Sequence, residues 1–293
     1  MLWENLREEE FEDAINKSSG LCILPMGCLE KHGQHLPVGT DYLETMSILD
    51  ATLKIEDAVL FPSCSWLGEV SCFHACKKPK EKHLRGCVGL KQETILNLLS
   101  ELCDEIGRNG FTKILIVNGH GGNTSMLKHF LRTQSYESKR YSTMLTSAFA
   151  FGEIDPKRLY KTVISDFKSF DYLTEEDLET LRRFSKSGTG GGHADIRETS
   201  LIMDADESLV APDRYEAESG LSTGAAKELT RLGVEISNGW LSDFPNSYEA
   251  YPPHGASASI GRAMKQICAL RLAKIIKAVK TDKSCVGAAS MLD

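Results

Sequence analysis

The stretch LCILPMGCLEKHGQHLPVGTD, residues 21–41, decides the fold, because in it a short apolar run passes into a glycine-containing polar loop. Residues 21–26 are apolar and lie between Gly20 and Gly27, which is typical of a strand buried on both faces of a sheet. Residues 42–55 then carry apolar side chains near helical spacing. A strand, a loop and a helix in this order predict one unit of a parallel sheet covered by helices.

The same alternation recurs along the chain. Further strands are expected at residues 59–62, 114–117 and 142–148, each short and apolar enough to be buried on both faces. Amphipathic helices are expected at residues 91–108, after Asn123 and from about residue 257 to 279. The pattern predicts an α/β protein with a mostly parallel central sheet.

No repeat, low-complexity tract or convincing boundary divides the 293 residues, so a single domain is predicted over 1–293. Within it, residues 166–192 are interpreted as a charged surface insertion followed by a flexible hinge. Residues 237–257 are rich in turn formers and are expected to form a long loop.

Composition narrows the class of protein. The chain has 41 Asp plus Glu against 34 Lys plus Arg and no clustered basic tract, which argues against nucleic acid or an anionic membrane as the main partner. Its apolar runs are far shorter than the ~20 residues that span a bilayer, and the acidic start lacks the pattern of a secretory signal. We therefore expect a cytoplasmic protein whose nine cysteines are reduced.

Side chains that can bind a metal follow the first predicted strand. Glu30 and His32 are two residues apart, so in extended backbone they project to the same side, and Asp41 follows at the expected start of a helix. In a doubly wound sheet this loop faces the ligand crevice. Two carboxylates and an imidazole there suit Zn, Mn or Fe. The alternative is structural: Asp41 would cap its helix, while His32 and His35 would lie at the surface.

The segment ILIVNGHGGN, residues 114–123, also runs from a strand into a glycine loop. His120 stands where a ligand at a strand end should stand. Gly121 and Gly122 allow close approach of a substrate to the backbone and can present N–H groups to an anion. A phosphate loop is the alternative, which the missing P-loop lysine disfavours.

The segment GGGHADIRETS, residues 190–200, adds a third chemically rich loop. His193 and Glu198 are five residues apart, a spacing that suits a loop leading into a regular element. The alternative is a flexible linker followed by a helix cap.

Together these segments supply five candidate metal ligands: Glu30, His32, Asp41, His120 and Glu198. One catalytic zinc needs only three protein ligands, whereas two metals that share a carboxylate use more. Such a pair activates a water near neutral pH and polarises a carbonyl or phosphoryl centre, and His193 would protonate the leaving atom. The sequence therefore predicts a metal-dependent hydrolase of a small molecule.

As a set, the motifs resemble the creatininase family of metal-dependent amidohydrolases. They stand in the order ExHGxHLPxGTD at 30–41, NGHGGN at 118–123 and HADIRETS at 193–200, and the resemblance spans roughly residues 10–280. It implies a three-layer α/β/α fold, usually assembled as a hexamer, with two divalent ions, zinc first and Mn or Fe as alternatives.

The resemblance also implies roles by position. Glu30, Asp41 and His120 would hold the first metal, and His32, Asp41 and Glu198 the second, with Asp41 bridging. His193 corresponds to the family's acid/base histidine. Gly121, Gly122 and His83 would bind the substrate, and His35 would support a ligand.

The chain departs from creatininase itself at several positions. Creatininase carries a glutamate ligand at the position of Gly122, so the second metal's carboxylate falls to Glu198. In HLRGCVGL, residues 83–90, Arg85 and Cys87 replace the family's Pro and Thr. These departures argue against creatinine itself, and the resemblance to the family implies a small cyclic amide or formamide as the substrate. Alternatives are a lactone or keto-inositol ring, or a non-catalytic binding protein on the same fold.

Cysteine chemistry is a further alternative. A structural zinc site could be formed by a group of residues close in sequence, and Cys28 near His32 could act as a nucleophile. The zinc group consists of Cys64, Cys72, His74, Cys76 and Cys87. Their spacing fits no common zinc-finger pattern, which favours core packing.

Overall fold

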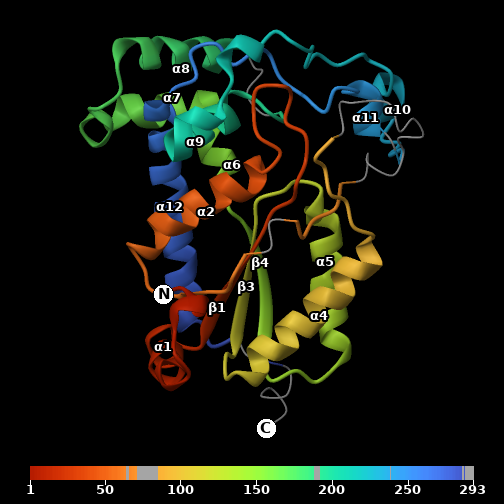
Figure 1. Cartoon of the computed structure of the whole chain (residues 1–293). Coiled ribbons are helices and arrows are strands. Elements are labelled where there is room, and N and C mark those ends of the chain that lie inside the picture. Colours follow the sequence, from red (N-terminus) through yellow and green to blue (C-terminus); the bar gives the residue numbers. More distant parts are fainter. Residues whose placement is uncertain (64–65, 71–84, 188–191, 238, 286, 288–293) are drawn as a thin grey trace.

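The computed structural model describes residues 1–293 apart from 64–65, 71–84, 188–191, 238, 286 and 288–293 (Figure 1). Its four described strands form one parallel sheet in the order β2-β1-β3-β4. They are β1 (Leu21–Met26), β2 (Val59–Leu60), β3 (Lys113–Asn118) and β4 (Ser142–Ser147). All four predicted strands are confirmed, and β1 has the predicted bounds.

The helices of the described residues surround this sheet. They are α1 (Phe11–Lys17), α2 (Thr40–Leu53), α4 (Gln92–Arg108), α5 (Asn123–Thr133), α6 (Phe151–Ile154), α7 (Pro156–Ser165), α8 (Glu175–Ser187), α9 (Ile196–Asp206), α10 (Lys227–Arg231), α11 (Gly239–Asp243) and α12 (Ala258–Thr281). None of them is long and apolar enough to cross a membrane.

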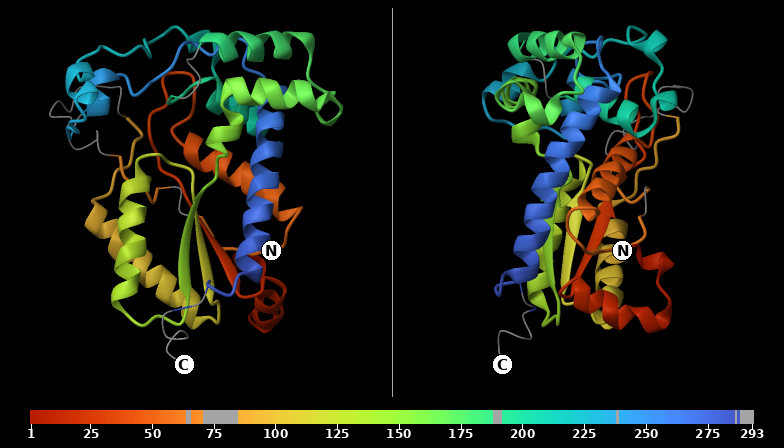
Figure 2. Two further views of the ribbon diagram at one scale, coloured as in Figure 1. Left: turned by 180° about the vertical axis from the view of Figure 1, so that it is seen from behind. Right: turned by 90° about the vertical axis from the view of Figure 1, so that its left-hand side faces the viewer.

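Alternation along β1 creates the two faces of the sheet. Leu21 and Ile23 belong to one core cluster, which α2 and α12 cover, whereas Cys22 and Leu24 belong to another, which α4 and α5 cover. Successive strand residues point to opposite faces, so a fully apolar strand fills both cores. The second view in Figure 2 shows the sheet between α12 on one side and α4 on the other. The three-layer α/β/α fold is therefore confirmed.

The prediction that every strand is buried on both faces is wrong for β4. All its residues are only partly buried, whereas every residue of β1 is buried. β4 stands at the edge of the sheet beyond β3, and an edge strand has a neighbour on one side only. Its sequence, STMLTS, has two polar residues at each end and only Met144 and Leu145 apolar, which suits that half-covered position.

Residues 156–187 form α7 and α8, which pack against each other. Phe170, Leu173 and Leu181 from this segment are buried in the same core cluster as α12. The interpretation of 166–192 as an insertion and hinge stays a prediction, and residues 188–191 lie outside the described part of the chain.

The strand order places a site at the carboxyl ends of β1 and β3. From β1 the chain passes to β2 on one side, and from β2 it returns across the sheet to β3 on the other. Loops that leave neighbouring strands in opposite directions open a crevice between them. The loops after β1 and β3 are those that carry the predicted ligands.

Candidate metal centre

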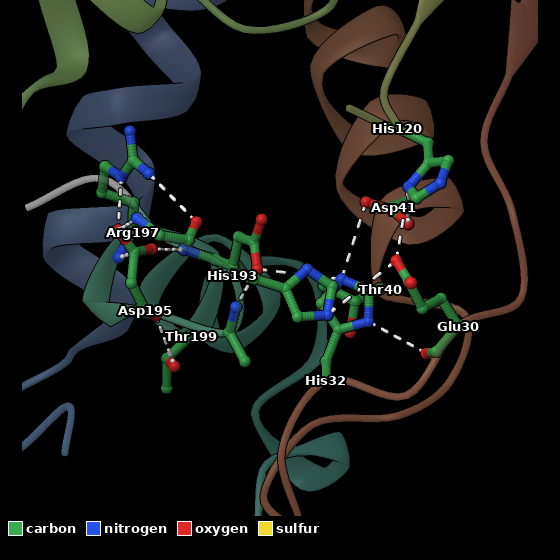
Figure 3. Close-up of polar contacts among 12 residues, drawn as sticks. Glu30, His32, Thr40, Asp41, His120, His193, Asp195, Arg197 and Thr199 are labelled. Carbon is green, nitrogen blue, oxygen red and sulfur yellow. Dashed lines mark hydrogen bonds and ion pairs between the residues drawn. The ribbon is translucent and has the colours of Figure 1, made fainter. Parts of the chain in front are cut away.

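The predicted ligands come together at the carboxyl ends of β1 and β3, and Figure 3 labels four of them, Glu30, His32, Asp41 and His120. They form overlapping groups in which all ligand atoms lie within 4.8 Å of one another. They come from the loop after β1 (Glu30 and His32), the first turn of α2 (Asp41), the loop after β3 (His120) and the first turn of α9 (Glu198).

The structural alternatives for the first loop are wrong. His32 and His35 are 0% and 1% exposed, so neither is a surface residue. Asp41 is the second residue of α2, and no side chain caps this helix. The loop instead folds back on itself, since the Glu30 N–H donates to the carbonyl of Val38 at 2.9 Å.

Asp41 lies at the centre of the cluster, with its two carboxylate oxygens facing different partners. Oδ1 is 3.6 Å from His32 Nε2, and Oδ2 is 3.1 Å from His120 Nδ1. Glu198 Oε2 adds to the His32 side at 3.8 Å, and Glu30 Oε2 adds to the His120 side at 3.5 Å. Two donor sets therefore share one carboxylate.

Backbone carbonyls hold both imidazoles in the orientation that a metal requires. His32 Nδ1 lies 2.9 Å from the carbonyl of Glu30, and His120 Nε2 lies 2.8 Å from the carbonyl of Glu69. A carbonyl only accepts, so these ring nitrogens donate and leave the opposite nitrogens free to bind a metal. His32 Nε2 is buried and has no hydrogen-bond partner in the described part of the chain. The residues present thus fit a metal centre.

The pKa values of the His32 and His120 rings also fit a cation-binding site. Burial lowers the pKa of His32 and His120, but the carboxylates of Asp41 and Glu30 outweigh it and raise the pKa to about 10 for His32 and about 9 for His120. Burial raises the pKa of Asp41, yet the two rings hold it well below its usual range. The carboxylates therefore attract a cation, and metal binding has to displace the ring protons.

Glu198 on α9 and Glu44 on α2 differ from Asp41, because the pKa of each is raised. Burial raises the pKa of Glu198 to about 7, against the lowering effect of His32. Glu44, one turn after Asp41 on α2, is 0% exposed, and both its oxygens lack a partner among the described residues. Burial and the charge of Glu198 raise the pKa of Glu44 well above its usual range, which favours the protonated form of this side chain.

His193 lies beside both donor sets, with its Nε2 3.9 Å from Glu30 Oε2. Its ring packs on the His32 ring with centroids 4.0 Å apart, and its Nε2 donates to the carbonyl of Lys31 at 2.8 Å. Burial and the neighbouring His32 lower the pKa of His193 to about 4. The ring is therefore neutral at pH 7, and its Nδ1 can accept a proton.

The aromatic side chain of Trp240 packs against His193. The Trp240 ring meets the His193 ring edge to face at 5.3 Å, and its Nε1–H donates to Glu249 Oε2 at 2.5 Å. Glu249 in turn pairs with His193 through two backbone hydrogen bonds of 2.9 and 3.1 Å. The position of His193 thus depends on the segment around Trp240.

His35 joins the β1 loop to the start of α9. Its Nε2 is 3.2 Å from the carbonyl of Ala194, the residue after His193, and the Ala194 N–H donates to Glu198 Oε2 at 2.6 Å. Burial lowers the pKa of His35 to about 4, so the ring is neutral and Nε2 donates. This arrangement suits the supporting role expected for His35.

Of the three predicted substrate-binding residues, the structure describes Gly121 and Gly122, and the space around these two glycines differs. Gly121 is exposed, and a Cβ at this position would meet no atom within 4 Å. At Gly122 a Cβ would lie 2.5 Å from His120 Nε2, so only glycine fits against that ring. His83 lies outside the described residues.

The match to known families identifies the chain. The model of the Creatininase family, described as creatinine amidohydrolase, matches residues 4–276. The chain belongs to the creatininase family.

Three curated proteins share local similarity with this family member. Creatinine amidohydrolase of Pseudomonas putida is 24% identical over 41% of this chain and 44% of that protein. The 2-amino-5-formylamino-6-ribosylaminopyrimidin-4(3H)-one 5'-monophosphate deformylase of Methanococcus voltae is 28% identical over 42% of this chain and 43% of that protein. The 3-dehydro-scyllo-inosose hydrolase of Thermotoga maritima is 31% identical over 36% of this chain and 31% of that protein. The chain thus spans less than half the length of each curated relative.

Solved creatininases share the fold over nearly the whole chain. A creatininase solved as "Creatininase Mn" matches with a TM-score of 0.69 at 17% identity, covering 96% of this chain and 99% of that one. A mutant creatininase of the "Zn-Zn type" matches with a TM-score of 0.67 at 17% identity, covering 96% and 98%. At such low identities the likeness shows the fold alone.

Sequence reasoning did not place Cys28 among the ligands of this creatininase-family site. Its thiol donates to Asp41 Oδ2 at 3.0 Å, and its sulfur groups with Glu30, Asp41 and His120. Burial and the nearby carboxylates raise the pKa of Cys28 well above its usual range, so it is a poor nucleophile. Cys28 stands two residues before Glu30, and the two-residue alternation that pairs Glu30 with His32 could have found it.

The other described cysteines are free thiols, buried except for the partly buried Cys285. Cys87 packs with Cys28 and Val70, and its sulfur accepts the N–H of Lys31 at 3.1 Å. Core packing is thus confirmed for Cys87. Cys64, Cys72, His74 and Cys76 lie outside the described residues.

Proposed function

We propose that the chain is a binuclear metal-dependent amidohydrolase that cleaves a C–N bond of a small cyclic amide or formamide. The proposal rests on the two carboxylate oxygens of Asp41, because Oδ1 faces His32 and Oδ2 faces His120. One carboxylate between two donor sets is the arrangement that a pair of ions shares.

We propose zinc as the resident ion, with manganese or iron as alternatives. Carboxylates and imidazoles accept all three, and solved neighbours are described as Mn and Zn-Zn types. When bound, such ions would lower the pKa of a water to near neutral and polarise a carbonyl.

The chain's own residues supply the proton transfers in this proposal. His193 is neutral and its ring lies beside the donor sets, with Nε2 3.9 Å from Glu30 Oε2, so His193 would take the proton of the attacking water. The same side chain would then return the proton to the departing nitrogen. Packing on His32 and Trp240 holds the His193 ring in place for both transfers.

The substrate class follows from the relatives. One is named a creatinine amidohydrolase and another a formylaminopyrimidine deformylase, and both names denote cleavage of a C–N bond. A second candidate is the opening of a keto-inositol ring, because the 3-dehydro-scyllo-inosose hydrolase is 31% identical over its aligned part.

A metal assay followed by an activity screen tests the proposal. Protein reconstituted with Zn or Mn should bind two ions per chain and hydrolyse at least one cyclic amide or formamide in a panel that also holds lactones and keto-inositols. Less than one equivalent of metal, unrestored by added Zn or Mn, would contradict the binuclear site. Turnover of only the keto-inositol would favour the second candidate, and tight binding without turnover would favour a non-catalytic binding protein.

We also propose that the chain assembles as a homo-oligomer, a hexamer by family resemblance. Light scattering of the purified protein would test this, and a monomer at micromolar concentration would contradict it.

A further inference from the structure

A cavity adjoins the metal centre on the β4 side of His120. Its volume is about 310 Å³, and it lies where β3 and β4 end against the first turns of α5. His120 and Gly121 line this cavity, and the His120 ring also belongs to the metal centre, so the two spaces share one loop. A molecule bound at the metals can therefore extend into the cavity.

The lining is electropositive. Among the described residues that line the cavity, Lys128 is the one lysine or arginine and none is a carboxylate, although the chain carries a net charge of −7. Lys128 is exposed and makes no ion pair with any residue that the structure describes. An anion bound in the cavity would be attracted by the charge of Lys128.

Hydrogen-bond donors converge on the same space. The cavity lies at the N-terminus of α5, where the helix dipole favours an anion, while the N–H groups of Asn123 and Thr124 already donate to the carbonyls of His120 and Gly121. Thr124 lines it with a hydroxyl, and the Ser147 hydroxyl, which accepts the N–H of Phe149 at 3.1 Å, keeps its own hydrogen to donate. Since a Cβ at Gly121 would meet nothing within 4 Å, a ligand can approach the backbone there.

Lys128 stands four residues after Thr124 on α5, so the two side chains share the face of the helix that lines the cavity. The volume of about 310 Å³ is at the small end of ligand sites, which favours a sugar phosphate over a whole nucleotide.

We propose that this cavity binds a phosphate monoester carried by the substrate, with Lys128 as its counter-ion. The inference rests on the proposed hydrolase function and adds that the amide substrate carries a phosphorylated arm. A phosphate offers three acceptor oxygens to the ammonium group of Lys128 and the hydroxyls of Thr124 and Ser147, whereas a carboxylate offers two.

Calorimetry on metal-free protein tests the inference without relying on turnover. EDTA-treated protein should bind ribose 5-phosphate, bind ribose at least tenfold more weakly, and bind ribose 5-phosphate at least tenfold more weakly after Lys128→Gln. The matched control is Lys161→Gln, an exposed lysine on α7, which should leave the affinity unchanged. Equal affinity of the wild type and Lys128→Gln would overturn the inference, and equal affinity for glycolate and ribose 5-phosphate would overturn phosphate as the ligand.

The two proposals fail in distinguishable ways. If no amide is hydrolysed by metal-loaded protein but the Lys128-dependent binding persists, the hydrolase proposal is wrong and the anion site stands. If amides are hydrolysed and Lys128→Gln leaves ribose 5-phosphate binding intact, the hydrolase stands and the phosphate site is wrong. Lys128→Glu, which reverses the charge, should weaken binding further than Lys128→Gln.

Discussion

At the scale of single residues, the position of the Asp41 carboxylate between His32 and His120 predicts that both metal ions depend on it. Asp41→Asn keeps the shape of the side chain but removes the charge that both imidazoles face. We expect the affinity for both metal ions to fall by more than about 100-fold, and turnover to be lost with it. Glu198→Gln should weaken only the ion on the His32 side. Equilibrium dialysis followed by metal analysis measures both.

Asp50→Asn is the matched control for Asp41→Asn, because Asp50 lies on the same helix, is exposed and pairs only with Lys54 among described residues. It should bind two ions like the wild type. Retention of one tightly bound ion by Asp41→Asn would contradict the bridging role.

His35 predicts a loss of stability in acid. Burial lowers its pKa to about 4, and the unfolded chain takes up this proton near pH 6.5. The unfolded state therefore binds more protons between these values, and the contribution of His35 is fully present above pH 6.5 and is lost as pH falls towards 4. At pH 5 the loss is about 2 kcal/mol.

Urea unfolding of metal-free protein at pH 7.5 and pH 5 measures this loss. His35→Gln should be less stable than the wild type at pH 7.5, because Nε2 no longer bonds to Ala194, but its stability should fall less between the two pH values. An identical fall in both proteins would show that His35 does not titrate in this range.

At the scale of elements, the start of α9 couples helix stability to the second donor set. Asp195 caps this helix, accepting the N–H groups of Arg197 and Glu198 at 2.9 and 3.2 Å, and it also pairs with the Arg197 guanidinium at 2.6 Å. The cap thereby fixes the residue that offers a carboxylate to His32.

Asp195→Ala should lower the free energy of unfolding by about 1–2 kcal/mol, or more because Arg197 loses its partner. It should also weaken the ion on the Glu198 side more than the ion on the Glu30 side. Asp155→Ala, which removes the corresponding cap of α7, is the control: stability falls but metal affinity does not. Equal weakening of both ions by Asp195→Ala would contradict the coupling.

Elements also show what the sequence can predict. The six residues of β1 are apolar on both faces, so both bounds of the strand could be predicted. The half-burial of β4 could not, since it depends on strand order, which no local pattern encodes. Likewise, the residue types of Glu30 and His120 mark them as candidate ligands in the sequence. The backbone carbonyls of Glu69 and Lys31, which orient His120 and His193, cannot be recognised from the sequence, because a carbonyl is the same in every residue. Long-range packing alone brings them to the site.

At the scale of the whole molecule, the site concentrates negative charge in the interior of a chain that is already acidic. Glu30, Asp41 and Glu44 are buried, and Glu198 lies beside them. Like charges so close destabilise the folded state unless cations balance them. In metal-free protein, protons on His32 and His120 provide that balance.

Metal ions should therefore stabilise the whole fold. An ion that binds only the folded state at 1,000 times its Kd adds about 4 kcal/mol, which for a chain of this size raises Tm by roughly 8–16 °C. We expect EDTA to lower Tm and Zn or Mn to restore it, as measured by calorimetry. The effect should grow from pH 6 to pH 8, because metal competes with protons for the two rings. Asp41→Asn should show almost no metal-dependent shift, and a full shift in that variant would place the stabilising ions elsewhere in the molecule.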